Sequence, residues 1–245
     1  NKAIYEYLDI KGEPHKKDVK NINPYLVEGK DLFISNRRNP LCDVQEISYG
    51  SFALDDGNYT ISEEEYKEII FSSPSTEQFL RPFIGGRELL RSINRYCVWL
   101  LDKNPSEIKK DKIILDKISK VKIWRENSNR LNTKKMASTP TIFAEIRQPS
   151  TNYLAFPTVS SENRNYIPIA YLSPDVIASN QLYTIPNTTL YDFGVLTSVM
   201  HMTWMRYVAG RLMSDYRYSS YVVYNHIPWP KNSSNKNIKK VKGKE

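Results

Sequence analysis

The sequence predicts an α+β fold in which short strands, in a mixed or antiparallel sheet, are flanked by helices. Three observations lead to this class. Apolar residues recur three to four apart over residues 105–130, which is the spacing of one helix face. Short β-type runs alternate with prolines between residues 140 and 186, and proline suits short or edge strands because it cannot donate a ladder hydrogen bond. An apolar stretch over 189–213, rich in methionine and tryptophan, predicts a buried helix.

The elements expected before residue 105 are short. Ser62 stands three residues before Glu65, which is the spacing of a capping box and predicts a helix over residues 62–71. Residues 75–81 allow another helical turn, which the following proline stops. The apolar run 96–101 predicts a strand that ends at the turn residues after it.

The helix expected over residues 105–130 places Ile114, Ile118, Val121 and Trp124 on one side, and most of its lysines fall on the other faces. This is the pattern of a lysine-covered surface helix that packs an apolar stripe on a core.

Strands are expected next over four short runs, residues 141–146, 152–156, 166–172 and 181–185. In the final helix, methionine and tryptophan are more typical of core filling than of a cofactor site. His201, in that helix, is interpreted as a hydrogen-bonded core or interface histidine.

The net charge of +8 is concentrated at one end of the chain. Residues 231–245 hold six lysines and one glutamate, whereas the preceding 230 residues hold 29 basic and 26 acidic groups. The tail is interpreted as a solvated end or linker, with a phosphate-seeking arm as the alternative. Bulk basicity is therefore a weak argument for a nucleic-acid partner, and specific clusters must carry that inference.

We divide the chain into a polar connector (1–21), one compact domain (22–230) and the Lys-rich tail (231–245). Because the sequence opens without methionine on charged residues, we expect a piece of a longer protein. No run approaches the roughly 20 apolar residues of a membrane span, and no signal-peptide pattern is present. Cys42 and Cys97 lack metal-type spacing, which favours a reducing, cytoplasmic setting.

The sequence lacks the motifs of the enzyme classes that we tested. A doubly wound sheet that binds S-adenosylmethionine needs a glycine-rich turn after its first strand, and Gly85-Gly86 is the one adjacent glycine pair. The adenine-methylating tetrapeptide, Asn or Asp followed by two prolines and an aromatic residue, is missing. No Walker-type loop or two-metal nuclease set is found, and nothing points to a hydrolase at His201 or His226. We expect the chain alone to be non-catalytic, with no cofactor or metal of its own.

Several collinear stretches resemble the target-recognition region of the MmeI-like family of DNA methyltransferases and combined restriction-modification enzymes. They are INPYLVEGKDLFISNRRNPLCDV (22–44), SEEEYKEI (62–69), FLRPFIGGRELL (79–90) with RYCVWLLD (95–102), residues 139–207, and GRLMSDYRYSSYVVYNHIPWP (210–230). RPFIGGREL also resembles the opening phrase of recognition domains in more distant DNA-adenine methyltransferases. The sequence departs from the family at Ile227, where Phe is expected.

This resemblance implies that the chain is the sequence-recognition part of a site-specific DNA adenine-N6 methyltransferase, with a fold of the target-recognition-domain type. A catalytic domain that uses S-adenosylmethionine would precede residue 1, and a nuclease would precede it in a fused enzyme. The implied partners are double-stranded DNA and the upstream catalytic domain of the same polypeptide, with no membrane. The alternative is a protein-interaction or scaffolding domain that does not bind DNA.

Base reading needs forked, amide and acidic side chains, because Arg pairs with guanine, Asn or Gln with adenine, and Glu or Asp with the cytosine amino group. Residues 130–166 carry these types on short connections that are rich in proline. In both Glu-x-Arg pairs of this segment, the alternative to base contact is a salt bridge between the two side chains. The candidates are Arg130, Lys134, Lys135, Glu145, Arg147, Glu162, Asn163 and Arg164.

A second candidate surface follows the expected long helix. Arg206 and Arg211 are placed at its C-terminal end, where helix-end electrostatics alone would favour a cation, so a capping role and a phosphate contact remain equal alternatives. Arg217 and Tyr218 lie beyond the helix and are the better candidates for phosphate contacts. We expect a weaker third site at Arg37 and its neighbour Arg38.

Overall fold

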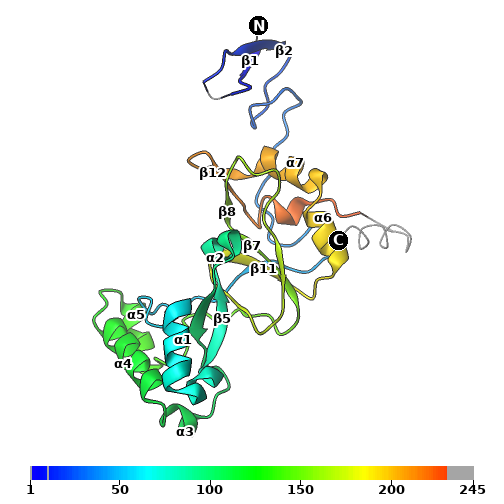
Figure 1. Ribbon diagram of the computed structural model, residues 1–245. Coiled ribbons are helices and arrows are strands. Elements are labelled where there is room, and N and C mark those ends of the chain that lie inside the picture. The colour runs from blue at the N-terminus through cyan, green and yellow to red at the C-terminus, as the bar shows by residue number, and fades with distance from the viewer. Residues whose placement is uncertain (1, 10, 231–245) are drawn as a thin grey trace.

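The computed structural model describes residues 2–9 and 11–230, so the Lys-rich tail lies outside the described residues. The chain forms a small N-terminal hairpin and two larger lobes joined at a narrow waist (Figure 1). The lower lobe in that view carries α1 and α3 to α5, and the upper lobe carries α6 and α7. Mixed helices and small sheets confirm the predicted α+β class. None of the described helices has the length and apolar content needed to cross a membrane.

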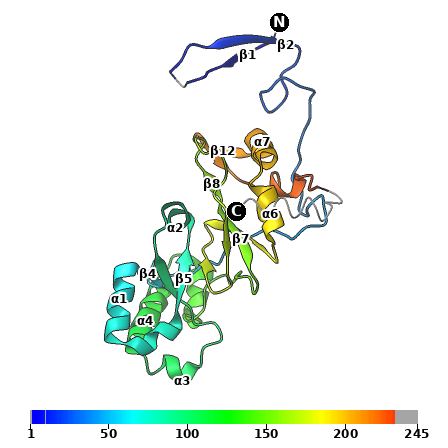
Figure 2. The same ribbon diagram turned by 45° about the vertical axis from the view of Figure 1, so that its right-hand side comes forward.

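The N-terminal hairpin occupies the segment that we expected to be a connector. Strands β1 (Lys2–Glu6) and β2 (His15–Val19) pair antiparallel. The hairpin stands apart from both lobes in two views (Figures 1 and 2). Lys17 forms an ion pair with Glu28 at 3.2 Å, which ties the hairpin to the strand-poor segment that leads into the upper lobe.

The lower lobe is built on a four-stranded sheet of order β10-β5-β6-β4, in which β10 is parallel to β5 and the other pairs are antiparallel. Its strands are β4 (Thr60–Ser62), β5 (Leu80–Ile84), β6 (Arg95–Val98) and β10 (Ile177–Ala178). Its helices are α1 (Glu63–Ser72), a 3₁₀ turn (Pro74–Phe79), α2 (Gly86–Arg91), α3 (Pro105–Ile108), α4 (Lys112–Glu126), α5 (Leu131–Lys135) and a 3₁₀ turn (Met136–Ser138).

The helix predicted from the Ser-Glu spacing is confirmed as α1. The Ser62 hydroxyl accepts a hydrogen bond from the Glu65 backbone N–H at 3.2 Å, which satisfies one of the free donors at the start of the helix. The Glu65 carboxylate binds Lys117 at 2.7 Å, so it connects α1 to α4.

The single helix predicted over residues 105–130 is divided into α3 and α4. Asp111 caps α4, because its Oδ1 accepts from the backbone N–H groups of Ile113 and Ile114 at 3.0 and 3.1 Å, and such a cap has a non-helical backbone. The predicted apolar stripe is otherwise confirmed, since Ile114 and Val121 lie fully within the core of the lower lobe.

The upper lobe contains two small sheets. An antiparallel sheet has the order β3-β11-β7-β9, and a second has the order β12-β13-β8. The strands are β3 (Ser48–Tyr49), β7 (Tyr153–Pro157), β8 (Val159–Ser160), β9 (Ala170–Leu172), β11 (Leu182–Pro186), β12 (Gly210–Leu212) and β13 (Asp215–Arg217). Three of the four predicted runs coincide with β7, β9 and β11. Residues 141–146 are not a strand, and their one ladder contact is the bridge between Phe52 and Glu145.

The long helix predicted over residues 189–213 is also divided. It forms α6 (Leu190–Leu196) and α7 (Val199–Val208). Ser198 starts α7 by accepting from the His201 backbone N–H at 3.2 Å, and serine competes with helix continuation in this way. After Val208 the chain turns into β12, so Arg211 lies on a strand and the helix-end explanation does not apply to it. A short 3₁₀ turn (Tyr224–His226) precedes the end of the lobe.

The two lobes meet through main-chain contacts at residues 50–52 and 177–180. The Ser51 backbone N–H donates to the Ala178 carbonyl at 2.8 Å. Gly50 lies so close to this strand that a Cβ atom on it would stand 2.4 Å from the Ser179 carbonyl oxygen. Only glycine fits without a shift of the backbone, so the waist is a tightly packed joint.

Candidate nucleic-acid interface

The candidate cations of the lower lobe cluster on α5. Arg130 is the residue before the helix, and Lys134 and Lys135 lie in its last turn. All three side chains are exposed, and no acidic side chain of the described chain pairs with them. They are therefore available to an anionic partner.

A buried arginine on α4 holds in place the backbone that follows the α5 cations. The Arg125 side chain is fully buried and has no carboxylate partner in the described chain. Each of its five N–H groups donates to a backbone carbonyl at 2.9 to 3.1 Å. The acceptors lie on two segments, at the waist and directly after α5: Ala53, Leu54, Met136, Thr139 and Ile142. Arg125 thus fixes α5 and the chain that follows it against the waist.

Glu145 and Arg147 form an ion pair with each other. This internal salt bridge was the alternative to base reading for the motif. Both side chains are exposed rather than enclosed. The backbone beneath them is fixed, since Glu145 pairs with Phe52 and the Arg147 N–H donates to the Ser51 hydroxyl at 3.0 Å. The pair therefore stands at the waist with its polar groups accessible to solvent.

The second Glu-x-Arg pair does not close on itself. Glu162 contacts Arg211 of β12 at 3.8 Å, and its backbone N–H donates to Asp215. Asn163 is exposed, whereas Arg164 is half-buried and its Nε has no partner among the described residues. The loop after β8 therefore carries an amide and a guanidinium that form few contacts with the described part of the lobe.

Arg206 and Arg217 lie near this loop on separate elements. Arg206 is in the last turn of α7 and reaches the Asn165 carbonyl at 3.5 Å, a long hydrogen bond. Arg217 is the last residue of β13 and is exposed. Within residues 2–9 and 11–230 neither has an acidic partner, so both add free positive charge to this side of the upper lobe.

Tyr218 does not lie on the surface. Only 4% of it is exposed, and its hydroxyl is 3.0 Å from His201 Nε2. His201 is itself 3% exposed, with Nδ1 against the Leu196 carbonyl, which confirms it as a hydrogen-bonded core histidine. Burial lowers the pKa of His201 to about 4, so the imidazole is neutral at pH 7. We remove Tyr218 from the set of candidate contacts because ligands outside the lobe cannot reach it.

Sequence reasoning missed two cations on α2. Arg87 and Arg91 are exposed and lack acidic partners in the described chain, and α2 lies at the waist between α5 and the β12 strand (Figure 1). The signal was the Gly85-Gly86 pair before them. Gly85 is crowded, because a Cβ there would stand 2.8 Å from the Glu88 carboxylate. That carboxylate accepts from the Gly85 N–H at 2.8 Å and pairs with Arg95 at 2.9 Å, so Gly85 serves the close packing at the start of α2.

Three further features of the described residues concern metals, thiols and cavities. No cluster of potential metal ligands is found in the described part of the chain. Cys97 is buried, which raises the pKa of its thiol and disfavours the reactive thiolate. A cavity of about 680 Å³ lies beside α6 and α7, and its lining is mainly apolar, without an aspartate or glutamate.

Comparisons with known proteins show which family this chain belongs to. A family model described as MmeI, target recognition domain, matches residues 28–231. DNA methyltransferase A of Bacillus subtilis (strain 168) is 38% identical over 231 residues, which cover 94% of this chain and 26% of that protein. The type IIL restriction-modification enzyme MmeI, solved in complex with DNA, superposes with a TM-score of 0.89 and 43% identity, over 97% of this chain and 32% of that one. The chain thus spans about a quarter to a third of these relatives, and it belongs to the family of MmeI target recognition domains.

Proposed function

We propose that this chain selects the target site of a site-specific DNA adenine-N6 methyltransferase by binding duplex DNA. The observation that carries the proposal is the set of exposed cations on α5, on α2 and beside the β12–β13 hairpin, which have no acidic partner among the residues that the structure describes. In Figure 1, α5 and the hairpin lie on the same side of the molecule, with α2 between them. The similarity to MmeI, whose solved structure is a complex with DNA, supports the same reading.

Phosphate contacts and base contacts would come from different residues. The cations of α5, with Arg206 and Arg217, are suited to phosphates because their charge is free. The Glu145–Arg147 pair is suited to a G·C base pair, since the fork of arginine matches the two guanine acceptors and a carboxylate can accept from the cytosine amino group. Asn163 and Arg164 are the corresponding candidates in the upper lobe.

We assign methyl transfer and S-adenosylmethionine to another part of the parent polypeptide. Two features of the described residues support this assignment: Gly85 is crowded by the Glu88 carboxylate, and the apolar cavity beside α6 and α7 has no acidic side chain. A separate catalytic domain would hold the flipped adenine, while this chain reads the bases that stay in the stack. The free thiols Cys42 and Cys97 favour a cytoplasmic setting for the parent.

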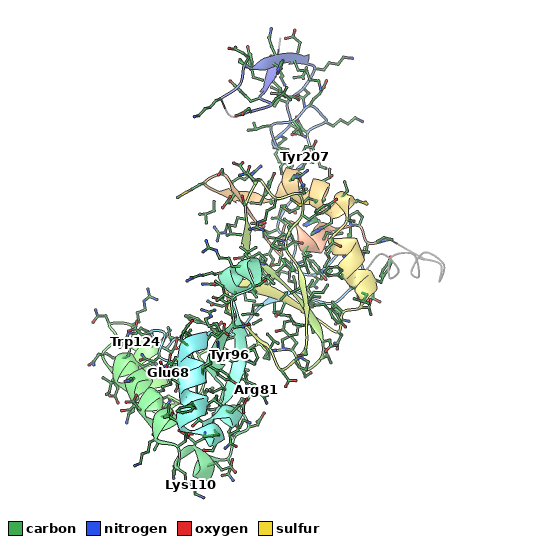
Figure 3. All side chains as sticks on the ribbon, viewed as in Figure 1. Glu68, Arg81, Tyr96, Lys110, Trp124 and Tyr207 are labelled. Carbon is green, nitrogen blue, oxygen red and sulfur yellow. The ribbon has the colours of Figure 1, made fainter. Side chains whose placement is uncertain are left out.

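Site selection from a randomised duplex library tests the proposal. We expect the chain to enrich one sequence, and we expect its affinity to fall steeply as salt rises from about 50 to about 200 mM. Arg147→Ala or Arg164→Ala should relax the choice at one base position while the others are kept. Lys110→Ala is the matched control, because Lys110 is exposed at the far end of the lower lobe (Figure 3).

Two results would contradict the proposal. If no sequence is enriched and a protein partner is bound instead, the chain is an interaction domain. If the pure chain transfers a methyl group from S-adenosylmethionine to DNA, the division between recognition and catalysis is wrong. Equal losses at every base position for both arginine variants would indicate misfolding rather than base reading.

A further inference from the structure

The β12–β13 hairpin ends in two apolar side chains that the described residues leave exposed. Leu212 is 52% exposed, and Met213, the first residue of the two-residue turn, is 97% exposed. The hairpin projects from the upper lobe in both ribbon views (Figures 1 and 2). Two-residue hairpin turns favour glycine, asparagine or aspartate, so turn geometry does not explain a methionine here.

The backbone of this turn is strained. Met213 has φ of 56°, in the left-handed region that costs a non-glycine residue roughly 1–2 kcal/mol. Strain of this kind persists where the surroundings hold it, and it is concentrated at functional positions. A methionine that is both strained and uncovered stabilises neither the turn nor the core, which leaves an external partner as its physical role.

The stem beneath the tip is rigid. Arg211 stacks over the Tyr216 ring with its guanidinium 3.8 Å from the ring centre, and its Nη1 donates to the Ser214 carbonyl at 2.7 Å. Asp215 accepts a hydrogen bond from the Glu162 backbone. Strand β8 adds a third strand beside β13. These contacts brace the stem, so insertion of the tip into a partner would cost little ordering entropy.

The charges around the tip indicate the kind of partner. Arg217, at the base of the hairpin opposite Gly210, and Arg206 on α7 have no acidic partner among the described residues, and the exposed tip of the hairpin is apolar. A DNA groove has the complementary arrangement, with phosphates on its rims and base edges and stacked base faces inside. Proteins that deform DNA insert leucine or methionine between base steps in this manner, and the unbranched, polarizable methionine adapts to such a gap.

We propose that the β12–β13 hairpin enters a groove of the bound duplex and that Leu212 and Met213 wedge into one base step. The proposal rests on the proposed function and deepens it. It names an element that would distinguish DNA sequences by how easily a base step unstacks, and not by the hydrogen-bond pattern of the base edges. Sequence choice at that step would then favour flexible pyrimidine–purine steps.

Duplexes that carry the selected site, with 2-aminopurine at successive positions, test the wedge in the full chain. We expect one position whose fluorescence rises on binding, because 2-aminopurine brightens when it is unstacked. Met213→Ala should remove this rise and weaken binding about tenfold, while the salt slope stays unchanged because no cation is lost. Phe71→Ala is the matched control, since Phe71 is 92% exposed on α1 and should change neither quantity.

Met213→Gly separates the wedge from the fold. Glycine relieves the left-handed strain, so the melting temperature should rise while the fluorescence signal disappears. The inference is overturned if Met213→Ala binds within about twofold of the wild-type chain with the same fluorescence, or if no 2-aminopurine position responds. If the wild-type chain selects no site at all, the proposed function fails first, and this inference fails with it.

Discussion

Replacement of Arg125 should destabilise the lower lobe more than any surface substitution. The fully buried guanidinium donates to five backbone carbonyls, and Arg125→Met removes all five donors while keeping an unbranched, flexible side chain. A buried acceptor without its donor costs about 1 kcal/mol at the low end. Part of this loss is returned, because the folded state no longer has to desolvate a charge. We therefore expect a loss of about 3–5 kcal/mol, roughly a fifth or more of the stability of a typical domain.

Urea unfolding at pH 7 measures this loss, with Arg91→Met as the exposed control. Arg125→Lys should fall between the wild type and Arg125→Met, because an ammonium group has three donors for five acceptors. A free energy of unfolding within about 1 kcal/mol of the wild type for both variants would refute the reasoning. It would mean that water or the chain itself satisfies those carbonyls without the arginine.

His201 has its ordinary pKa of 6.5 in the unfolded chain and about 4 when buried, so the unfolded state binds more protons between these values. Stability should fall as pH drops from 6.5 to 4, by about 3 kcal/mol, and urea titrations of His201→Gln should lack this component; an unchanged slope would contradict the burial argument. Tyr218→Phe should lower the melting temperature by a few degrees, at a cost of about 1 kcal/mol, and leave the salt slope of DNA binding unchanged; an altered slope would return Tyr218 to the interface. Lys134→Ala should weaken all duplexes alike and reduce the salt slope by about one unit, and a loss confined to one sequence would instead indicate base reading. Gly50→Ala should lower the melting temperature strongly, because its Cβ would stand 2.4 Å from a carbonyl oxygen; a melting temperature equal to that of the wild type would show that the waist is not tightly packed.

Short sequence patterns predicted the helix start at Ser62 and the apolar face of α4 correctly. The Ser62 cap and the buried spacing of Ile114 and Val121 could be read directly, because neighbouring residues set them. The two predicted long helices were wrong in extent, since Asp111 and Ser198 act as caps inside an apolar pattern that continues past them. In the sequence, a Ser or Asp that caps a new helix cannot be told from a Ser or Asp on the exposed face of one continuous helix. The tertiary fold decides which of the two roles the residue takes.

An internal salt bridge was one alternative for both Glu-x-Arg motifs of the candidate site, and the fold forms it in one of them. Glu145 and Arg147 do contact each other, whereas Glu162 turns to Arg211, because β12 and β13 bring a residue 49 positions later beside the loop. Tyr218 was misplaced for a related reason. It follows an exposed arginine on a strand, and alternation along a strand sends neighbouring side chains to opposite faces.

The near-neutral charge of the body is compatible with an anionic partner because of where its acidic groups lie. Several carboxylates form internal ion pairs, and in each pair the two charges cancel locally. The pairs are Glu65 with Lys117, Glu88 with Arg95 and Glu162 with Arg211. The cations of α5 and α2 have no such partners in the described chain. Exposed charges act over about one Debye length, roughly 8 Å at physiological salt, so a duplex at the waist would experience these free cations rather than the net charge. Reversing one free cation, as in Lys134→Glu, should therefore weaken duplex binding far more than Lys110→Glu, although both change the net charge equally. Equal losses in a salt titration of the two variants would show that total charge decides.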